Sequence, residues 1–130
     1  MMVVRRIVVD IAADNVAELR RFYEALFALK TVMDQGWIAT LAAGTDGPVQ
    51  ISVAREGGSG TAVPDVSIEV DDVDALYAKA RSRGHTIVYP LTDEPWGVRR
   101  FYLRDPAGKV LNILSHIGDS HEVDHLLSQR

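Results

Sequence analysis

The stretch VDIAADNV at residues 9–16 recurs as VSIEVDDV at residues 66–73, a shift of 57 positions (9 to 66). Both copies place apolar residues at the same positions before an acidic turn, and the correspondence continues to Leu19 and Leu76. Self-similarity at a fixed shift is the sequence signature of a repeated structural unit. Two copies are too few for a solenoid, so we expect a duplicated domain whose halves fold alike.

The composition sets bounds on the domain and on its chemistry. A chain of 130 residues fits a single compact domain over 1–130 that buries roughly two-thirds of its unfolded surface. It contains no cysteine, which excludes a disulfide framework, a thiolate nucleophile and a cysteine-ligated zinc site and fits a reducing cytosol. Any metal chemistry must therefore come from histidine and carboxylate side chains.

Charge and hydropathy narrow the expected partners. The net charge is −4 and the basic residues are scattered, whereas binding to nucleic acid requires a concentrated positive surface. The apolar N-terminal run is interrupted by Arg5 and Arg6 and reaches Asp10 too early for a signal peptide or a membrane span. We expect a soluble, cytoplasmic protein that binds neither nucleic acid nor membrane, and a neutral or mildly cationic small ligand suits its charge.

The first half is predicted to be a β-α-β-β-β module spanning residues 3–54. A strand rich in β-branched residues over 3–13 leads to Asp14, which is expected to cap a helix. Further strands are expected at 30–33, 37–41 and 48–54, after turn signals that include Gln35-Gly36 and Asp46-Gly47. The apolar stripe of the helix consists of Val16, Leu19, Phe22, Tyr23 and Leu26.

The second half repeats this order over residues 65–116. Asp71 or Asp72 should cap its helix, and Gly84 occupies the position where helices often end in a left-handed residue. The helix stripe consists of Val73, Leu76, Tyr77 and Ala80, and the strands are expected at 65–70, 85–89, 98–104 and 109–115. A connector at 55–64, with a flexible glycine-rich stretch over 55–61, joins the modules, and a tail over 117–130 carries a short polar helix at 119–129.

Alternation along each strand separates two faces of the predicted sheet. The apolar rows, such as Ile7, Val9 and Ile11, are expected to pack under the helices. The mixed rows then line an open, concave side, and the pattern alone fits a binding pocket and a solvated sheet face equally well. The polar members of the mixed rows are Asp10, Gln50, Ser52, Asp65, Ser67, Glu69, Arg100, Tyr102, Asn112 and His116.

Two tryptophans can supply flat walls for an organic ligand. Trp37 begins a predicted strand, and Trp96 lies in a loop beside Gly97 and close to Arg100. Each tryptophan alone is more readily explained as core or interface filling. The neighbouring glycine and arginine make Trp96 the stronger candidate.

In its motifs the chain resembles the vicinal oxygen chelate superfamily, which comprises glyoxalases, bleomycin resistance proteins and extradiol dioxygenases. The resemblance lies in residues 13–26, in 66–76, in Trp96-Gly97-Val98-Arg99-Arg100-Phe101 and in the segment 105–114, which opens with an Asp-Pro-x-Gly turn. It implies an α+β fold in which two tandem βαβββ modules form a curved, mostly antiparallel eight-stranded sheet around a cleft. It also implies a homodimer with sites near the interface.

The enzymes of this superfamily hold a divalent metal through His, Gln and Glu on the first, fourth, fifth and eighth strands. On this chain those positions fall at Val8, near Gln50 or Ser52, at Asp65 and at Asn112. Valine cannot act as a ligand, and the amide of Asn112 replaces an anion that helps to hold a partly hydrated dication. We therefore expect no bound metal and no other cofactor, and metal-dependent catalysis by Lewis acidity is not expected.

Two histidine features leave alternatives open. His121 and His125 match the H-E-x-x-H pattern of helical zinc sites, but the chain offers no downstream third ligand, so we expect a polar tail helix with adventitious metal binding at most. His116 ends the last strand on the concave side. It could act as an acid, a base or a hydrogen-bonding group for a ligand, or it could cap backbone carbonyls.

These observations predict a metal-free small-molecule binding protein of the bleomycin resistance type, which acts by sequestering a cationic or aromatic organic ligand. No catalytic residue is assigned. The expected ligand-binding residues are Asp10, Trp37, Gln50, Asp65, Glu69, Trp96, Arg100, Tyr102, Asn112 and His116.

Two other functional classes stay open at this point. The first is a glyoxalase-like lyase, isomerase or dioxygenase whose zinc, nickel, manganese or iron is held by an unusual set such as Asp10, Asp65, Glu69 and His116. The second is an interaction module whose concave face is covered by a partner chain. The glycine-rich connector also permits the modules to pair within one chain or to swap across a dimer.

Overall fold

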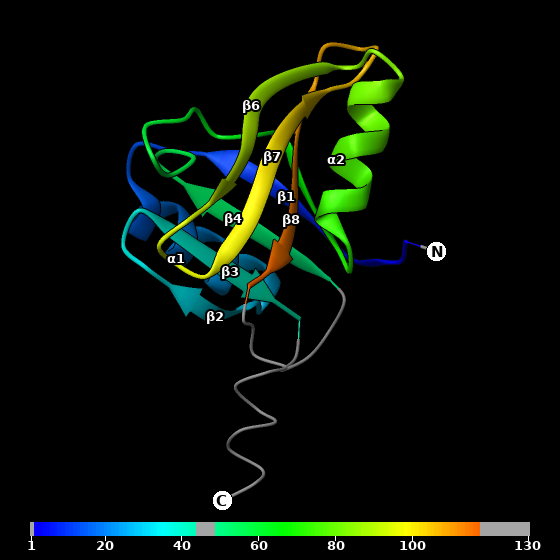
Figure 1. Cartoon of the computed structure of the whole chain (residues 1–130). Helices are drawn as coiled ribbons and strands as arrows, with labels where there is room; N and C mark the ends of the chain where they lie inside the picture. The colour runs from blue at the N-terminus through cyan, green and yellow to red at the C-terminus, as the bar shows by residue number, and fades with distance from the viewer. Residues whose placement is uncertain (1, 44–48, 118–130) are drawn as a thin grey trace, which may run out of the picture. The chain divides into compact units, whose positions relative to one another are not determined.

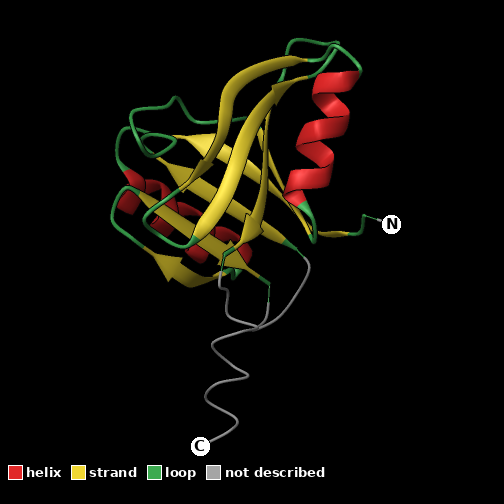
Figure 2. Cartoon of the chain, viewed as in Figure 1, coloured by secondary structure: helices red, strands yellow, loops and turns green. Residues whose placement is uncertain are grey.

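The computed structural model describes residues 2–43 and 49–117. The chain divides into two compact units. The N-terminal unit comprises Arg6–Ser67, and the C-terminal unit comprises Met1–Arg5 together with Ile68–Arg130. Each unit contains one helix packed on its own set of strands (Figures 1 and 2).

The N-terminal unit is built from four strands and one helix in β-α-β-β-β order. The strands follow the spatial order β2-β3-β4-β1, in which β1 runs parallel to β4 while β2, β3 and β4 are mutually antiparallel. The elements are β1 (Val4–Ala12), α1 (Val16–Phe27), β2 (Lys30–Asp34), β3 (Ile38–Ala42) and β4 (Gln50–Ala54).

The core of this unit lies between α1 and the strands β2, β3 and β4 (Figure 2). Leu41 and Val53 are completely buried, and Val16 packs against them from the helix. Since side chains alternate along a strand, the neighbours of these residues must point to the opposite face of the sheet. We call the face of each unit that points away from its helix the polar face.

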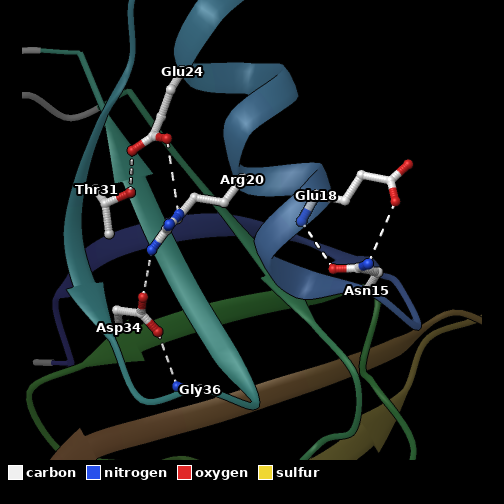
Figure 3. Close-up of polar contacts among 7 residues, drawn as sticks. All are labelled: Asn15, Glu18, Arg20, Glu24, Thr31, Asp34 and Gly36. Atoms are coloured by element: carbon white, nitrogen blue, oxygen red, sulfur yellow. Dashed lines mark hydrogen bonds and ion pairs between the residues drawn. The ribbon is translucent and has the colours of Figure 1, made fainter.

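The helix α1 begins one residue later than the sequence predicts. Asn15, and not Asp14, is the N-cap, because its Oδ1 accepts a hydrogen bond of 3.0 Å from the backbone amide of Glu18. The Asn15 side chain also donates to the Glu18 carboxylate at 3.4 Å (Figure 3). The shift arises because the sheet bonding continues to Ala13, whose amide donates to the carbonyl of Ala54.

A polar clamp holds α1 to the β2–β3 hairpin (Figure 3). Arg20 Nη1 lies 2.6 Å from Asp34 Oδ2, and the Thr31 hydroxyl donates to Glu24 at 2.7 Å. Asp34 also accepts from the backbone amide of Gly36, which has a φ of 84° in the turn. The clamp therefore connects one helix face to the hairpin through side chains from α1 and β2.

The C-terminal unit repeats the same order. Its strands follow the order β5-β8-β7-β6, and α2 packs on β6, β7 and β8 (Figure 1). The elements are β5 (Val66–Val70), α2 (Val73–Ser82), β6 (Thr86–Asp93), β7 (Val98–Arg104) and β8 (Val110–His116). The core consists of Val70, Val73, Ala80, Phe101 and Ile113, with Leu76 and Tyr77 packed against it.

The caps of α2 agree with the sequence prediction. Asp72 Oδ1 accepts from the amide of Ala75 at 3.0 Å, so Asp72 is the N-cap of the two candidates. Asp71 instead accepts from the amide of Val3 at 2.8 Å. Gly84 follows the helix with a φ of 74°, a conformation that glycine adopts without steric cost.

Two predictions about apolar rows are wrong. Ile7 and Val9 were expected under a helix, but they are 56% and 49% exposed, because α1 lies on β2, β3 and β4. Phe22 and Leu26 are exposed as well, so the buried stripe of α1 is narrower than the sequence suggests. In α2, by contrast, all four stripe residues belong to the core or pack against it.

The connector is more regular than a flexible linker. The amide of Gly57 donates to the carbonyl of Thr61, and both the amide and the hydroxyl of Thr61 donate to the carbonyl of Gly58. Gly58, Ser59 and Gly60 all have positive φ values, which shows that the glycines serve a tight turn.

The predicted α+β class of two βαβββ modules is confirmed. The strand β6 runs on to Asp93, beyond the predicted end at Tyr89, because a register irregularity between Tyr89 and Thr92 accommodates Pro90 within the pairing with β7. The predicted turn at Asp46-Gly47 and the predicted tail helix at 119–129 lie outside the described residues. Within the described part of the chain, no helix is long and apolar enough to cross a membrane.

Candidate functional site

The polar face of the N-terminal unit carries two hydrogen-bonded pairs of side chains, one between β3 and β4 and one between β1 and β4. The hydroxyls of Thr40 and Ser52 lie 2.7 Å apart, and both residues are buried. Arg6 Nη1 donates to Gln50 Oε1 at 3.1 Å. Ser52 is the register partner of Asp10 on the parallel strand β1. Polar side chains on this face are therefore paired with one another across neighbouring strands.

Asp10 is the most unusual titratable group on this face. Its Oδ2 accepts a hydrogen bond of 2.7 Å from the Ser67 hydroxyl, and its amide donates to the carbonyl of Asp65 at 3.1 Å. Burial, the largest influence, raises the pKa of Asp10 from 3.8 to about 7; Ser67 and Arg6 lower it, and the charge of Asp65 raises it further. The Asp10 carboxyl therefore titrates near neutral pH.

The polar face of the C-terminal unit carries a buried ion pair. Arg100 Nε lies 2.7 Å from Glu94 Oε2, and the two side chains are only 4% and 2% exposed. The Tyr89 hydroxyl donates to the same Glu94 oxygen at 3.0 Å, and Arg100 Nη1 donates to the Tyr102 hydroxyl at 3.0 Å. A buried charge is costly unless it is paired and hydrogen-bonded, and both charges here meet that condition.

Aromatic rings surround the guanidinium of this pair. Its central carbon lies 4.9 Å from the ring centroid of Trp96, 5.0 Å from that of Tyr102 and 5.3 Å from that of Tyr89. These distances are within the range of favourable cation–π contacts. We call Tyr89, Glu94, Trp96, Arg100 and Tyr102 the Arg100 cluster.

The loop that carries Trp96 is closed by its own backbone. The amide of Glu94 donates to the carbonyl of Val98 at 2.8 Å, and the amide of Gly97 donates to the carbonyl of Glu94 at 3.1 Å. Gly97 has a φ of 91°, and its carbonyl accepts from the amide of Ile117. The loop therefore presents Trp96, which is half-buried, from a defined turn.

The remaining predicted site residues are Glu69, His116, Asn112 and Trp37. His116 Nδ1 lies 3.1 Å from Glu69 Oε2, which links the ends of β8 and β5 on the polar face. Asn112 is buried and is the register partner of Tyr102. Trp37 is half-buried, and its carbonyl accepts from the amide of Arg55 at the start of β3.

The predicted site residues thus fall into small groups within each unit. In the N-terminal unit Asp10 lies beside Asp65, while Gln50 pairs with Arg6 and Trp37 lies at one end of β3. The C-terminal unit brings Trp96, Arg100 and Tyr102 together in the Arg100 cluster, pairs Glu69 with His116, and places Asn112 opposite Tyr102.

Sequence reasoning missed several members of these groups. Glu94 was missed because an acidic residue before a Pro-Trp-Gly loop usually indicates solvent exposure. Tyr89 was missed because its strand was predicted to end there. Arg6 could have been found, since it shares the alternation of Val8 and Asp10 along β1.

The residues at the superfamily's metal positions do not fit a divalent ion. Val8 is 4% exposed and offers no donor atom, and Asn112 offers only a neutral amide. In the part of the chain that the structure describes, no three or more His, Asp or Glu side chains are grouped so that they could hold a metal ion. This donor chemistry does not meet the charge and ligand number that such ions require.

Comparison with known proteins supports the family assignment. A family model described as the Glyoxalase/Bleomycin resistance protein/Dioxygenase superfamily matches residues 5–113. No curated protein matches the chain.

Solved structures share the fold at low sequence identity. An NAD-dependent benzaldehyde dehydrogenase structure from Legionella pneumophila is 18% identical with a TM-score of 0.72, over 85% of this chain and 98% of that chain. A superfamily member from Vibrio splendidus 12B01 is 12% identical with a TM-score of 0.63, over 88% and 100%. Methylmalonyl-CoA epimerase from Mycobacterium tuberculosis is 15% identical with a TM-score of 0.59, over 87% of each chain. At these identities the likeness shows the fold alone.

Proposed function

The chain belongs to the glyoxalase/bleomycin resistance protein/dioxygenase superfamily, and from that premise we propose that it binds a small organic ligand without a metal ion. The observation that carries the proposal is the donor set. Val8 is a buried apolar residue at the first-strand metal position, and the described residues contain no group of three His, Asp or Glu side chains suited to a metal.

The two polar faces support a cationic or aromatic ligand. On the N-terminal unit, Asp10 becomes an anion near neutral pH, and a ligand cation beside it would relieve the cost of its buried charge. On the C-terminal unit, the half-buried Trp96 offers a flat surface beside Arg100, while the buried Tyr102 accepts a hydrogen bond from the same guanidinium. We assign these groups to ligand binding and not to covalent catalysis, because none of them forms a nucleophile with an adjacent base.

A thermal-shift screen tests the proposal. Purified protein is heated with cationic glycopeptide antibiotics and with aromatic metabolites over a range of ligand concentrations. A ligand that binds only the folded state stabilises it by about 2.7 kcal/mol at 100 times Kd, so Tm must rise steadily with concentration. Failure of every compound to raise Tm up to millimolar concentration would refute the binding function.

The variant Asp10→Asn distinguishes cationic ligands from neutral aromatic ligands. We expect cationic hits to bind this variant more weakly, since it removes the carboxylate that opposes their charge, whereas neutral aromatic hits keep their affinity. Asp14→Asn is the matched control, because Asp14 is an exposed carboxyl outside the site.

A further inference from the structure

The Arg100 cluster depends on a residue that no sequence motif singles out. A single oxygen of Glu94, Oε2, accepts from Arg100 Nε at 2.7 Å and from the Tyr89 hydroxyl at 3.0 Å. The side chain is 2% exposed, so water does not compete for these bonds. Glu94 thereby fixes the plane of the guanidinium at one edge.

Arg100 extends this anchoring to two more aromatic side chains. Its Nη1 donates to the Tyr102 hydroxyl at 3.0 Å, and its guanidinium carbon lies 4.9 Å from the Trp96 ring centroid. A guanidinium is planar, so its hydrogen-bond directions and its stacking faces turn together. A change at Glu94 is therefore transmitted through Arg100 to both rings.

The backbone of the loop does not by itself fix the indole of Trp96. Backbone bonds between Glu94, Gly97 and Val98 close the turn, but they leave the Trp96 side-chain torsions to be set by its contacts. The guanidinium of Arg100 is one of these contacts. The same turn can thus persist while the indole moves.

We infer that Glu94, acting through Arg100, is a positioning residue that sets the orientation of Trp96 and Tyr102 on the polar face of the C-terminal unit. Its effect on affinity rests on the proposed function, whereas the orientation of Trp96 is measurable in the ligand-free protein. Failure of the binding function and failure of the positioning role are therefore distinguishable.

Fluorine NMR reports the orientation directly. The chain has two tryptophans, so labelling with 5-fluorotryptophan gives two signals, which Trp37→Phe and Trp96→Phe assign. We expect Glu94→Gln to shift the Trp96 signal and to leave the Trp37 signal in place. Asp93→Asn is the matched control, because it removes the neighbouring carboxylate, which pairs with Arg99 at 3.3 Å on the exposed side. An unchanged Trp96 signal in folded Glu94→Gln would overturn the inference.

A double variant tests whether Glu94 acts through Arg100. Glu94→Gln removes the carboxylate that pairs with the buried Arg100 and lowers the stability. Arg100→Met removes the guanidinium from Trp96 and should displace the Trp96 signal by itself. We expect Glu94→Gln to cause no further displacement when it is added to Arg100→Met, because its effect passes through the guanidinium. A further displacement in the double variant would overturn the inference. If Glu94→Gln alone does not fold, this comparison carries the test.

Binding of benzyltrimethylammonium, a cationic aromatic probe, tests the effect on affinity. We expect Kd to rise roughly fivefold in Glu94→Gln and to stay unchanged in Asp93→Asn. A roughly fivefold rise corresponds to the loss of a cation–π contact of ordinary strength. An unchanged Kd in Glu94→Gln would overturn the link between Glu94 and affinity. If the wild type binds neither this probe nor any compound of the screen, the binding function fails while the fluorine result still decides the positioning role.

Discussion

Asp10 shows at the scale of one residue how burial sets charge. Its pKa rises from 3.8 to about 7, chiefly because burial disfavours the carboxylate, with Asp65 adding to the rise and Ser67 and Arg6 opposing it. The folded protein therefore keeps a proton that the unfolded chain releases between these two pH values. The stabilising contribution of the protonated group is complete below pH 3.8 and is lost as the pH rises through about 7.

Asp10→Asn should therefore become more stabilising as the pH rises. Asparagine is uncharged and keeps an oxygen that accepts from Ser67. We expect its advantage over the wild type in urea denaturation to grow by roughly 1–3 kcal/mol between pH 5 and pH 8. Asp14→Asn should show no comparable growth, and an Asp10→Asn advantage that is the same at both pH values would contradict the raised pKa.

The sequence located part of the site at this scale because strand alternation is a local rule. It placed Asp10, Arg100 and Tyr102 on the polar face, where the structure has them. It could not find Glu94, because the burial of that carboxylate depends on side chains from β6 and β7 that only the folded chain brings together. Whether the ten predicted residues bind a ligand stays a prediction.

At the scale of the elements, helix caps offer a sharp comparison. Asn15 caps α1, while its neighbour Asp14, the residue that the sequence suggests, is exposed and lies outside the helix. Asn15→Ala should lower the free energy of unfolding by about 1 kcal/mol, whereas Asp14→Ala should change it by only a few tenths. Urea denaturation of the two variants checks this, and equal losses would argue against Asn15 as the cap.

The clamp between α1 and the β2–β3 hairpin gives a second prediction for the elements. Arg20 lies 2.6 Å from Asp34 and is partly shielded from water, whereas the adjacent Arg21 is exposed. Arg20→Met should destabilise the fold by about 0.5–1 kcal/mol, and Arg21→Met should be close to neutral. Hydrogen exchange should also be faster in the hairpin of Arg20→Met alone. A hairpin equally protected in both variants would rule out the clamp.

The positions of helices and strands were predictable from periodicity. Which of their apolar residues are buried by the packing of helix on sheet was not. All four stripe residues of α2 belong to the core or pack against it, as predicted. The same reasoning failed for Phe22 and Leu26 on α1, and for Ile7 and Val9 on β1. Periodicity shows that a residue shares an apolar face, but it does not show how far the helix extends over the sheet.

At the scale of the whole molecule, duplication preserved the framework and changed the polar faces. Both units have the same element order and a core of apolar residues under one helix. Where one unit pairs the small hydroxyls of Thr40 and Ser52 across neighbouring strands, the other pairs Tyr102 with Asn112. The repeat in the sequence predicted the shared framework, and the family match over residues 5–113 confirms the resemblance. The differences between the faces arise from side chains that the repeat does not constrain.

The most direct test of metal-independent binding is a calorimetric titration of a screen hit into protein that was purified without a tag, with and without prior treatment with EDTA. Metal analysis of the same sample accompanies it. We expect an identical Kd in both titrations and far less than one equivalent of zinc, nickel, manganese or iron. Binding that is lost in EDTA and restored by one of these ions, together with near-stoichiometric metal that Asp65→Asn removes, would contradict it.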